Sequence, residues 1–252
     1  MVIAVLNSKG GVGKTVTAVG LAVALAAPRR RILLVDLDSQ ACASQWCGIS
    51  RNQLRPSAAS VLFEKYPILK AIRHTPVPHL DLLTGSLDLA NADLALASMR
   101  GREVALRRML ERVREHYELT VIDCPPGLSL LSINAILAAD GLVVPVTAEP
   151  LAAEALESLV ASLDRVRTRM HTGTRLLGIV LTQTDPRRAV TRETGERLRA
   201  EYRDQVFHTE LRWSAAIAGA PDARRPPAAT DAFRRLGGEV LHRLAAARHD
   251  RG

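Results

Sequence analysis

The segment SKGGVGKT, residues 8–15, combines three glycines with two of the four lysines in the chain. Glycines allow the backbone to curl so that successive N–H groups point inward, and such a nest binds phosphate oxygens. Within it, Lys14 can reach the β- and γ-phosphates of a nucleotide, and the Thr15 hydroxyl can be a ligand of Mg²⁺. The segment therefore predicts a loop that binds a nucleoside triphosphate with magnesium.

Lys9 is the unusual residue of this loop. The general phosphate-loop pattern, G-x-x-x-x-G-K-[S/T], places a glycine at position 8, where this chain has Ser8. Two cations that converge on one triphosphate would stabilise its spread negative charge, which gives Lys9 a function beside Lys14. A solvated loop lysine without a binding role is the alternative.

Acidic residues follow two apolar runs. LLVDLD, residues 33–38, places Asp36 and Asp38 at the end of one run, and LTVID, residues 119–123, places Asp123 at the end of another. Parallel strands present such side chains at their carboxyl ends, where α/β proteins bind their ligands. We expect the Asp123 carboxylate to serve Mg²⁺, usually through water.

Strand-like runs and helical patterns alternate along the chain. The runs are 2–7, 31–38, 80–85, 119–126, 141–148, 175–183 and 206–211, and the helical patterns are 14–27, 102–116, 151–170, 189–203 and 228–247. Strands that are apolar throughout indicate a parallel sheet covered on both faces. Residues 48–79 are the least regular part and are expected to hold one or two short helices. We predict an α/β fold with a doubly wound, mostly parallel central sheet and helices on both faces, in a single domain of residues 1–252.

The composition narrows the choice of partners. A net charge of +8, carried mostly by arginine, suits a polyanion such as nucleic acid, although coding bias also enriches arginine. No apolar run approaches the ~20 residues of a membrane span and no basic leader opens the chain, so we expect a soluble, cytoplasmic protein. The three cysteines form no C-x-x-C pair, which argues against a disulfide framework or a zinc site.

Several segments resemble one protein family. KGGVGKT, residues 9–15, resembles the deviant Walker A motif of the ParA/MinD family of ATPases, which carries a signature lysine at its start. LLVDLDSQACAS (33–44) is similar to the family's LLVDLDPQGNAS, and VIDCPPGLSLLSINAILAAD (121–140) is similar to its Walker B segment. GAP (219–221) resembles the end of the family's base-binding segment. The resemblance covers most of the chain and implies a P-loop NTPase fold of the deviant Walker A type.

The resemblance also implies roles for matching residues. Lys9 would cross a dimer interface to touch the nucleotide of the partner subunit, Asp38 would position the attacking water, and Asp36 would lie near the magnesium. The implied nucleotide ligands are Lys9, Gly10, Gly11, Val12, Gly13, Lys14, Thr15, Val16 and Pro221; the implied magnesium residues are Thr15, Asp36 and Asp123; and the implied catalytic residues are Lys9, Lys14 and Asp38.

Three positions depart from the family pattern. Val16 replaces the second threonine of GKTT and removes a hydroxyl that commonly touches the α-phosphate, a loss that costs ~1.5–3 kcal/mol for a hydrogen bond to a charged group. In residues 211–221, Ser214 stands where an asparagine reads the base, and Ala216 stands where an arginine is associated with DNA binding. Gly-Leu-Ser at 127–129 replaces Ser-Leu-Gly and is minor. We expect ATP binding to be weakened but kept.

The activity implied by the resemblance is slow, magnesium-dependent hydrolysis of ATP to ADP and phosphate. ATP would close a homodimer that binds double-stranded DNA without sequence preference, and a ParB-like, centromere-binding activator would stimulate hydrolysis. The protein would segregate chromosome or plasmid DNA on the nucleoid and would not bind membranes. Arg188, Arg192 and Arg199 are candidate DNA contacts, because they fall on one helical face and such a basic face contacts phosphates without base readout. The resemblance adds Arg187, which matches an arginine of the family's D-x-R segment that is linked to DNA. A charged, solvated helix is the alternative for this face, since glutamates interleave with the arginines.

Three alternative functions are compatible with the same fold class, and the sequence argues against two of them. A ParA-like ATPase that positions a protein cargo cannot be separated from DNA partition by sequence. A MinD-like membrane switch requires a bulky amphipathic helix at the carboxyl end, whereas residues 236–252 contain Gly-Gly, several alanines and no aromatic residue. An iron-protein reductase would need two cysteines per subunit at cluster positions, and neither Cys42 nor Cys124 resembles those.

Overall fold

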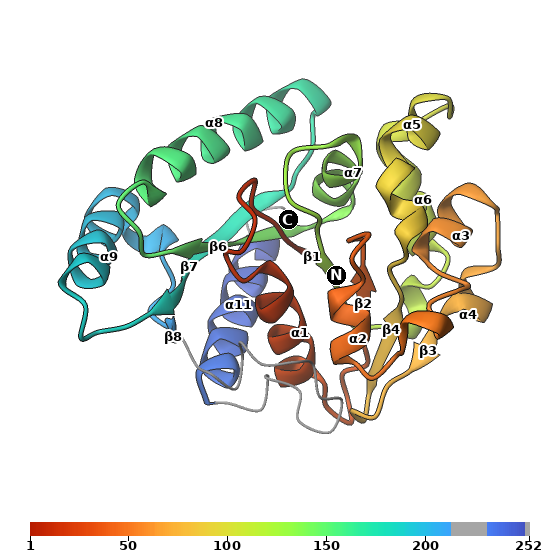
Figure 1. Cartoon of the computed structure of the whole chain (residues 1–252), viewed down its shortest axis with the longest axis horizontal. Helices are drawn as coiled ribbons and strands as arrows, with labels where there is room; N and C mark the ends of the chain where they lie inside the picture. The colour runs from red at the N-terminus through yellow and green to blue at the C-terminus, as the bar shows by residue number, and fades with distance from the viewer. Residues whose placement is uncertain (213–230, 250–252) are drawn as a thin grey trace.

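In the computed structural model, which describes residues 1–212 and 231–249, the apolar runs form an eight-stranded sheet (Figure 1). The strands are β1 (Val2–Val5), β2 (Ile32–Asp36), β3 (Arg73–His74), β4 (Leu80–Leu83), β5 (Leu119–Asp123), β6 (Gly141–Thr147), β7 (Arg175–Thr184) and β8 (Leu211–Arg212). Their order across the sheet is β3-β4-β2-β5-β1-β6-β7-β8. Neighbouring strands are parallel except β3 and β4, which pair antiparallel at one edge. The predicted doubly wound, mostly parallel sheet is confirmed.

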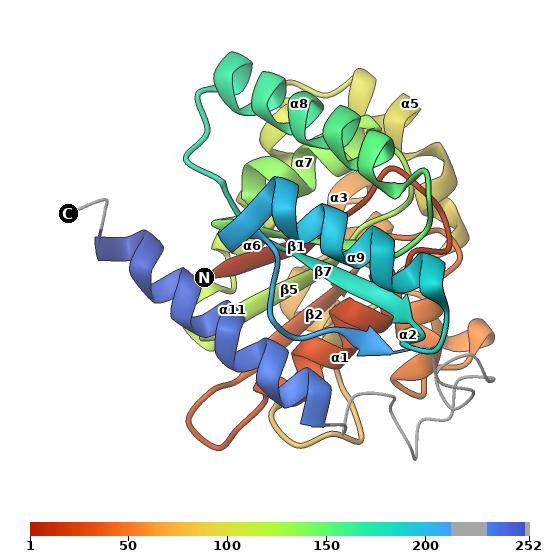
Figure 2. The same ribbon diagram turned by 90° about the vertical axis from the view of Figure 1, so that its left-hand side faces the viewer.

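Helices cover both faces of the sheet (Figures 1 and 2). One face carries α1 (Lys14–Leu25), α2 (Cys42–Trp46) and α11 (Asp231–His249). The other carries α3 (Ala58–Phe63), α4 (Ile68–Ala71), α5 (Ala92–Ala97), α6 (Ala105–Glu111), α7 (Leu130–Ala138), α8 (Ala152–Met170) and α9 (Ala189–Tyr202). Short 3-10 turns lie at Arg51–Gln53, Leu87–Asn91 (η2), Arg102–Val104, Arg114–His116 and Arg203–Gln205.

The sheet separates two aliphatic cores. Successive side chains of a strand point to opposite faces, so Ile3 and Val5 of β1 pack with α1 and α11, whereas Ala4 and Leu6 pack on the opposite side. We call these the α1 core and the α7 core. Because both faces of each central strand are buried, the strands are apolar throughout, which is the pattern that predicted a covered parallel sheet.

Helix α11 packs on α1 through an aromatic ring and a glycine. Phe233 is 1% exposed, and a Cβ atom added to Gly20 would lie 2.1 Å from its ring. Real non-bonded carbon atoms do not approach so closely, so glycine is required for α11 to lie against α1 at this distance. Since α1 begins at Lys14, this contact also sets the position of the helix that follows the phosphate loop.

Two segments differ from the sequence prediction. Residues 206–211 were predicted as a strand, but Val206 forms only an isolated bridge with Ile179, and the strand is Leu211–Arg212. The reason is that the Glu239 side chain of α11 accepts the backbone N–H groups of His208 and Thr209, which a strand would have used in its ladder. The helix predicted at 102–116 is divided into α6 and two 3-10 turns.

Other elements were missed or are shorter than predicted. Helices α2 and α5 and the two-residue strand β3 were not predicted, because each is too short to show a period in the sequence. Within 48–79 the structure has α3, α4 and a 3-10 turn where one or two short helices were expected. The three cysteines are free thiols, in agreement with the absence of a C-x-x-C pair.

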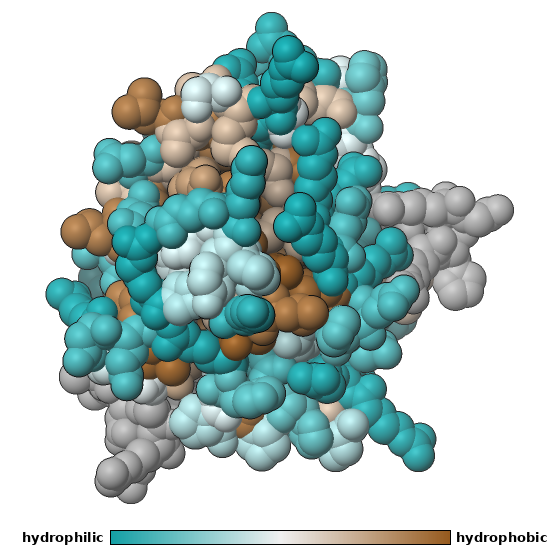
Figure 3. All heavy atoms as spheres, turned by 90° about the vertical axis from the view of Figure 1, so that its right-hand side faces the viewer, coloured by the Kyte–Doolittle hydropathy of each residue, from teal (hydrophilic) through white to brown (hydrophobic). Residues whose placement is uncertain are grey.

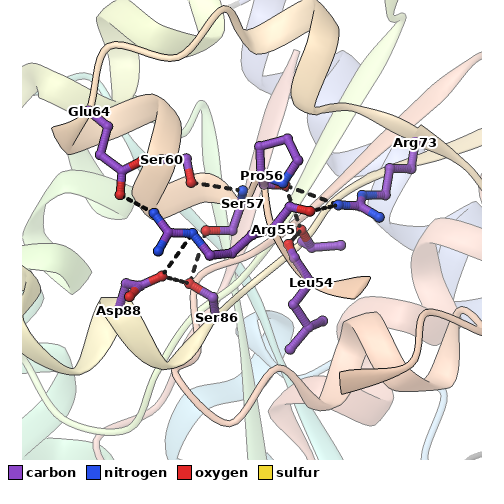
Figure 4. Close-up of polar contacts among 10 residues, drawn as sticks. Leu54, Arg55, Pro56, Ser57, Ser60, Glu64, Arg73, Ser86 and Asp88 are labelled. Carbon is purple, nitrogen blue, oxygen red and sulfur yellow. Dashed lines mark hydrogen bonds and ion pairs between the residues drawn. The ribbon is translucent and has the colours of Figure 1, made fainter. Parts of the chain in front are cut away.

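Side-chain contacts hold the irregular segment before β4 against the end of that strand (Figure 4). Arg55 forms an ion pair with Glu64, and Arg73 donates to the carbonyl of Arg55 at 2.6 Å. Just after β4, the Thr84 hydroxyl donates to the Leu54 carbonyl at 2.6 Å. The residues just after β4 are therefore fixed from the outer side of the sheet.

The surface over α3 to α6 is mixed, with hydrophilic atoms around scattered apolar ones (Figure 3). Leu69, Leu87 and Leu94 are the exposed leucines on α4, η2 and α5. Such scattered exposure is usual for folded proteins. Among the residues that the structure describes, no helix is long and apolar enough to cross a bilayer.

Candidate nucleotide site

The candidate site lies where β1, β2 and β5 end side by side. Val5 of β1 and Asp36 of β2 both pair in register with Asp123 of β5. The strand order changes direction at β1, and such a switch point opens a crevice at the carboxyl ends of the strands. The loop after β1 and the two predicted acidic segments thus come together at one edge of the sheet.

The loop from Ser8 to Gly13 has the shape of a phosphate cradle. Gly11 and Gly13 have φ of +75° and +86°, a backbone conformation that favours glycine. A Cβ atom added to Gly10 or Gly11 would meet nothing within 4 Å, so the loop opens into free space. Gly13 is the N-cap of α1, whose positive dipole end points at this space. These features fit a phosphate ligand.

Two residues at the end of β7 hold the back of the loop. The Thr182 hydroxyl donates to the Val12 carbonyl at 2.8 Å, and the Gln183 amide donates to the Gly11 carbonyl at 2.5 Å. These two contacts use carbonyl groups of the loop and do not occupy its N–H groups, of which that of Lys9 donates to the Asn7 side chain at 3.0 Å. Thr182 and Gln183 were not predicted as site residues, although their place at the end of a predicted parallel strand is the signal that would have found them.

The two lysines of the loop take different positions. Lys14 is buried, and its ammonium donates to the Lys9 carbonyl at 2.9 Å. Burial lowers the pKa of Lys14, while the negative charges of Asp123 and Asp38 oppose that shift. Lys9 instead points outward, and its ammonium lies 2.6 Å from the Glu149 carboxylate with both side chains about half exposed, 51% and 55%. An exposed pair of this kind is worth only ~0–1 kcal/mol, so Lys9 can leave it readily.

Asp123 is a buried carboxylate whose oxygens both lack a hydrogen-bond partner. Burial raises the pKa of Asp123 well above its usual range, and the charge of Asp36 raises it further. The nearby Thr15 hydroxyl and the positive charge of Lys14 lower this pKa but do not offset the rise. An orphaned buried carboxylate beside a phosphate cradle fits a magnesium site. Among the described residues, no three His, Cys, Asp or Glu side chains gather as a metal cluster. Mg²⁺ commonly binds to one or two carboxylates together with substrate phosphates, and the buried Asp123 carboxylate beside the loop can supply one of these.

Asp36 differs from Asp123 because both of its oxygens are occupied. Oδ1 accepts the backbone N–H of Asp38 at 3.1 Å, and Oδ2 accepts the N–H and the hydroxyl of Ser44 at 2.9 and 2.7 Å. Burial raises the pKa of Asp36 to about 6, and the hydrogen bonds from Ser44 and Asp38 limit the shift. Asp38 itself is half-buried and lines the cavity in front of the loop.

The cavity in front of the loop has a volume of about 440 Å³. Its walls include Lys14, Thr15, Val16 and Asp38, all of which were predicted. They also include Cys42, Trp46, Leu211 and Arg212, which were not, because no spacing in the sequence relates them to the loop. Pro221, Ser214 and Ala216 lie outside the described residues.

Three of the predicted arginines lie exposed around the start of α9. Arg187 is 90% exposed and forms an ion pair with Asp185 at 3.1 Å. Arg188 is the N-cap residue of α9, and Arg192 donates to the Pro186 carbonyl at 2.9 Å. All three guanidinium groups are at the surface, where a polyanion can reach them.

The fourth arginine, Arg199, has a different environment. It is 33% exposed, donates to the Phe207 carbonyl at 2.9 Å and forms an ion pair with Glu210 at 2.9 Å. These contacts tie α9 to the segment before β8. The geometry favours a structural role for Arg199, although its spacing from Arg188 and Arg192 suggested the same face.

The chain is similar in sequence to proteins that are already known. Residues 1–176 match the sequence family described as AAA domain. The sporulation initiation inhibitor protein Soj of Bacillus subtilis is 36% identical over 244 residues, which cover 97% of this chain and 96% of Soj. The chromosome partitioning protein ParA of Caulobacter vibrioides is 35% identical over 251 residues, 96% of this chain and 94% of that protein. The chain belongs to the ParA family.

Solved structures agree with the ParA fold. Cobyrinic acid a,c-diamide synthase from Mycobacterium smegmatis, with bound ADP and magnesium, is 30% identical and superposes with a TM-score of 0.84 over 97% of this chain and 95% of its own. Cyanothece McdA in a complex with ATP has a TM-score of 0.83 at 19% identity, over 97% of this chain and 96% of its own, and shows the shared fold. The protein is therefore a ParA-like P-loop ATPase, and ATP or ADP with magnesium are the cofactors found in its structural neighbours.

Proposed function

We propose that this ParA-family ATPase is an ATP-dependent dimerising switch that binds DNA without sequence preference and segregates chromosome or plasmid DNA. The observation that carries the proposal is the position of Lys9. Its side chain points out of the loop to Glu149 and not into the cavity that Lys14 serves. A cation on the rim of the site, held only by a weak ion pair, is available to the nucleotide of a second subunit.

The residues of the site would have different roles in hydrolysis. The N–H groups of the loop and the Lys14 ammonium would hold the phosphates, and Asp38 would orient the attacking water. Bound Mg²⁺ would neutralise charge that develops on the phosphates, with Thr15 and Asp123 as the residues that hold it. Slow turnover would then set the lifetime of the dimer, and a ParB-like protein on the cargo would shorten that lifetime.

The exposed arginines support DNA as the surface on which the switch acts. Arg187, Arg188 and Arg192 offer guanidinium groups that contact phosphates without reading bases. A dimer doubles this patch, so ATP-dependent binding follows from valency. The protein would then be a cytoplasmic, nucleoid-associated ATPase.

The C-terminal helix does not favour membrane binding. Phe233, Leu236, Val240 and Leu244 of α11 are buried in the α1 core. A membrane-surface helix needs such an apolar face free, and within the described residues this face of α11 is already packed.

DNA binding under three nucleotide conditions tests the proposal. Binding to unrelated double-stranded DNA would be measured with ATP, with ADP and without nucleotide, across a salt series. We expect binding only with ATP, without sequence preference, and with an affinity that falls by ~0.9 logarithmic units per tenfold salt for each phosphate contacted. If ATP binds but DNA does not in any condition, the DNA part of the proposal is wrong.

Lys9→Ala is expected to leave nucleotide binding largely intact while removing ATP-dependent dimers. Lys9 lies outside the cavity, so its own subunit keeps the loop and Lys14. Binding of a fluorescent ATP analogue and the mass in solution would be measured on the same samples, with Lys65→Ala as the control. Loss of nucleotide binding by the monomer would show that Lys9 acts within its own subunit.

Arg192→Ala is expected to weaken DNA binding at low salt and to reduce the slope of the salt dependence by ~0.9 for each phosphate that the variant no longer neutralises. Arg199→Ala is the matched variant on the same helix. It should leave the salt dependence unchanged but lower the free energy of unfolding by ~1–3 kcal/mol, because Glu210 and the Phe207 carbonyl are deprived of their donor. Equal effects of both variants on DNA would contradict the structural role of Arg199.

A further inference from the structure

Two buried carboxylates face each other across β2 and β5, yet only one of them is free. Asp123 has no hydrogen-bond partner on either oxygen. Asp36, its partner in register, accepts three hydrogen bonds, all from residues that follow it in the chain. Hydrogen bonds to an ionised group are among the stronger ones in proteins. A metal would therefore have to compete with Asp38 and Ser44 for Asp36, whereas Asp123 offers its oxygens without such competition.

Ser44 connects Asp36 to the neighbouring strand. It is fully buried on α2, and its hydroxyl donates to Asp36 while accepting the backbone N–H of Gly85 at 3.0 Å. A serine hydroxyl has one hydrogen to donate and lone pairs to accept with, so both roles are used here. The ends of β2 and β4 are thus joined through one side chain.

Gly85 lets the two strand ends come this close. A Cβ atom added there would lie 2.6 Å from the Asp38 carbonyl oxygen and 2.9 Å from the carboxyl carbon of Asp36. The turn is also held from outside, because the Ser86 hydroxyl lies 2.9 Å from that of Ser57 (Figure 4). The turn after β4 therefore packs closely against the loop that carries Asp38.

The resemblance placed Asp36 among the magnesium residues. We propose instead that Asp36 is a positioning residue: with Ser44 and Gly85 it holds the loop of residues 37–43 so that Asp38 faces the cavity. The proposal rests on the proposed function in taking Asp38 as the residue that orients water. Its structural part, the bracing of the loop by Ser44, applies to the nucleotide-free protein as well.

The first test uses the nucleotide-free protein. Amide hydrogen exchange of residues 37–44 would be compared in the wild type, Ser44→Ala and the control Ser60→Ala, which removes a buried hydroxyl on α3. Because the Ser60 hydroxyl itself accepts the N–H of Ser57, a second control is Thr174→Ala, which removes a buried hydroxyl just before β7. We expect exchange in residues 37–44 to become at least tenfold faster in Ser44→Ala and to stay unchanged in Thr174→Ala. Unchanged exchange in Ser44→Ala, or equal acceleration in Ser44→Ala and Thr174→Ala, would overturn the brace. This outcome does not depend on whether the protein hydrolyses ATP.

The second test separates positioning from metal binding. The magnesium concentration needed for half-maximal binding of a fluorescent ATP analogue would be measured for Asp36→Asn, Ser44→Ala and Asp123→Asn. We expect a change of less than threefold for the first two and more than tenfold for Asp123→Asn. Single-turnover hydrolysis should nevertheless fall at least tenfold in Ser44→Ala, with nucleotide affinity unchanged.

The outcomes of the second test distinguish the possible failures. If Asp36→Asn shifts the magnesium requirement as much as Asp123→Asn, Asp36 is a metal ligand and the proposal is wrong. If Asp36→Asn does not fold, the Ser44→Ala variant tests the proposal by itself. Hydrolysis by Ser44→Ala at the wild-type rate would overturn the proposal. If the wild type itself neither binds nor hydrolyses ATP, the proposed function fails, while the exchange experiment still tests the brace.

Discussion

Asp123→Asn is expected to stabilise the nucleotide-free protein and to abolish its magnesium-dependent hydrolysis of ATP. The wild-type carboxylate is buried without a hydrogen-bond partner and lies opposite the charge of Asp36. Removing the charge should raise the free energy of unfolding by ~1–3 kcal/mol, because a charge buried opposite Asp36 costs more than the neutral amide that replaces it. Hydrolysis should fall on the order of 10²- to 10³-fold, because charge stabilisation by a metal is worth several kcal/mol. Denaturant unfolding and phosphate release measure the two effects.

A control variant tests whether the loss of any carboxylate has these two effects. Asp164→Asn removes an exposed carboxylate from α8 and should change neither quantity measurably. If Asp123→Asn lost stability in the nucleotide-free protein, the carboxylate would have a partner that the structure does not show. If hydrolysis survived, Asp123 would not be the residue that holds magnesium.

The stability of the wild type should also depend on pH. A carboxylate whose pKa is raised in the folded state destabilises the fold fully above that pKa, and this destabilisation is lost as pH falls from the folded-state pKa to the unfolded-state pKa of ~4. Burial raises the pKa of both Asp36 and Asp123, that of Asp36 to about 6. As pH falls toward ~4, the unfolded-state pKa of aspartate, the advantage of Asp123→Asn over the nucleotide-free wild type should therefore shrink. An advantage that grew with acidity would contradict this assignment.

Gly20→Ala is expected to destabilise the wild type but to stabilise a Phe233→Ala variant. In the wild type the added methyl group would overlap the Phe233 ring, at a cost of ~1–3 kcal/mol or more. Phe233→Ala alone should cost ~3–5 kcal/mol through the cavity it leaves. In that background the clash is gone, and alanine within α1 should gain ~0.5–1 kcal/mol over glycine.

A double-mutant cycle measured by urea unfolding tests this coupling. The sign of the Gly20→Ala effect should reverse between the two backgrounds, which gives an interaction energy well above the ~0.5 kcal/mol expected of independent sites. Gly238→Ala on α11, where an added Cβ meets nothing within 4 Å, is the control and should not depend on Phe233. Additive effects at Gly20 would show that α11 does not rest on α1 through this ring.

The sequence predicted the sheet and the loop because both depend on local patterns. Continuous apolar runs marked the parallel strands, and glycine spacing with Lys14 and Thr15 marked the phosphate cradle. The sequence also placed Asp36 and Asp123 correctly at strand ends. It could not distinguish them, because the difference lies in Ser44 and in the approach of Gly85 from another strand. The same limit applies to Lys9, whose partner Glu149 is 140 residues away.

Long-range contacts also explain the elements that were misassigned. Residues 206–211 have the composition of a strand, but Glu239 from α11 takes the N–H groups of His208 and Thr209. Arg199 has the helical spacing of a surface contact, but its ion pair with Glu210 directs the guanidinium toward the segment before β8. In each case a glutamate on a different segment decides the outcome, 30 residues from Thr209 for Glu239 and 11 residues from Arg199 for Glu210, and the period of the segment itself does not report it.

The division of the interior into an α1 core and an α7 core has a consequence for how such a protein can diversify. Helix α1, which follows the phosphate loop, shares its core with α11, whereas α7, α8 and α9 share the other. Substitutions without common neighbours combine additively, so changes on opposite faces of the sheet should accumulate almost independently. Changes in α8 and α9 should therefore accumulate with little effect on α1, the helix that follows the phosphate loop.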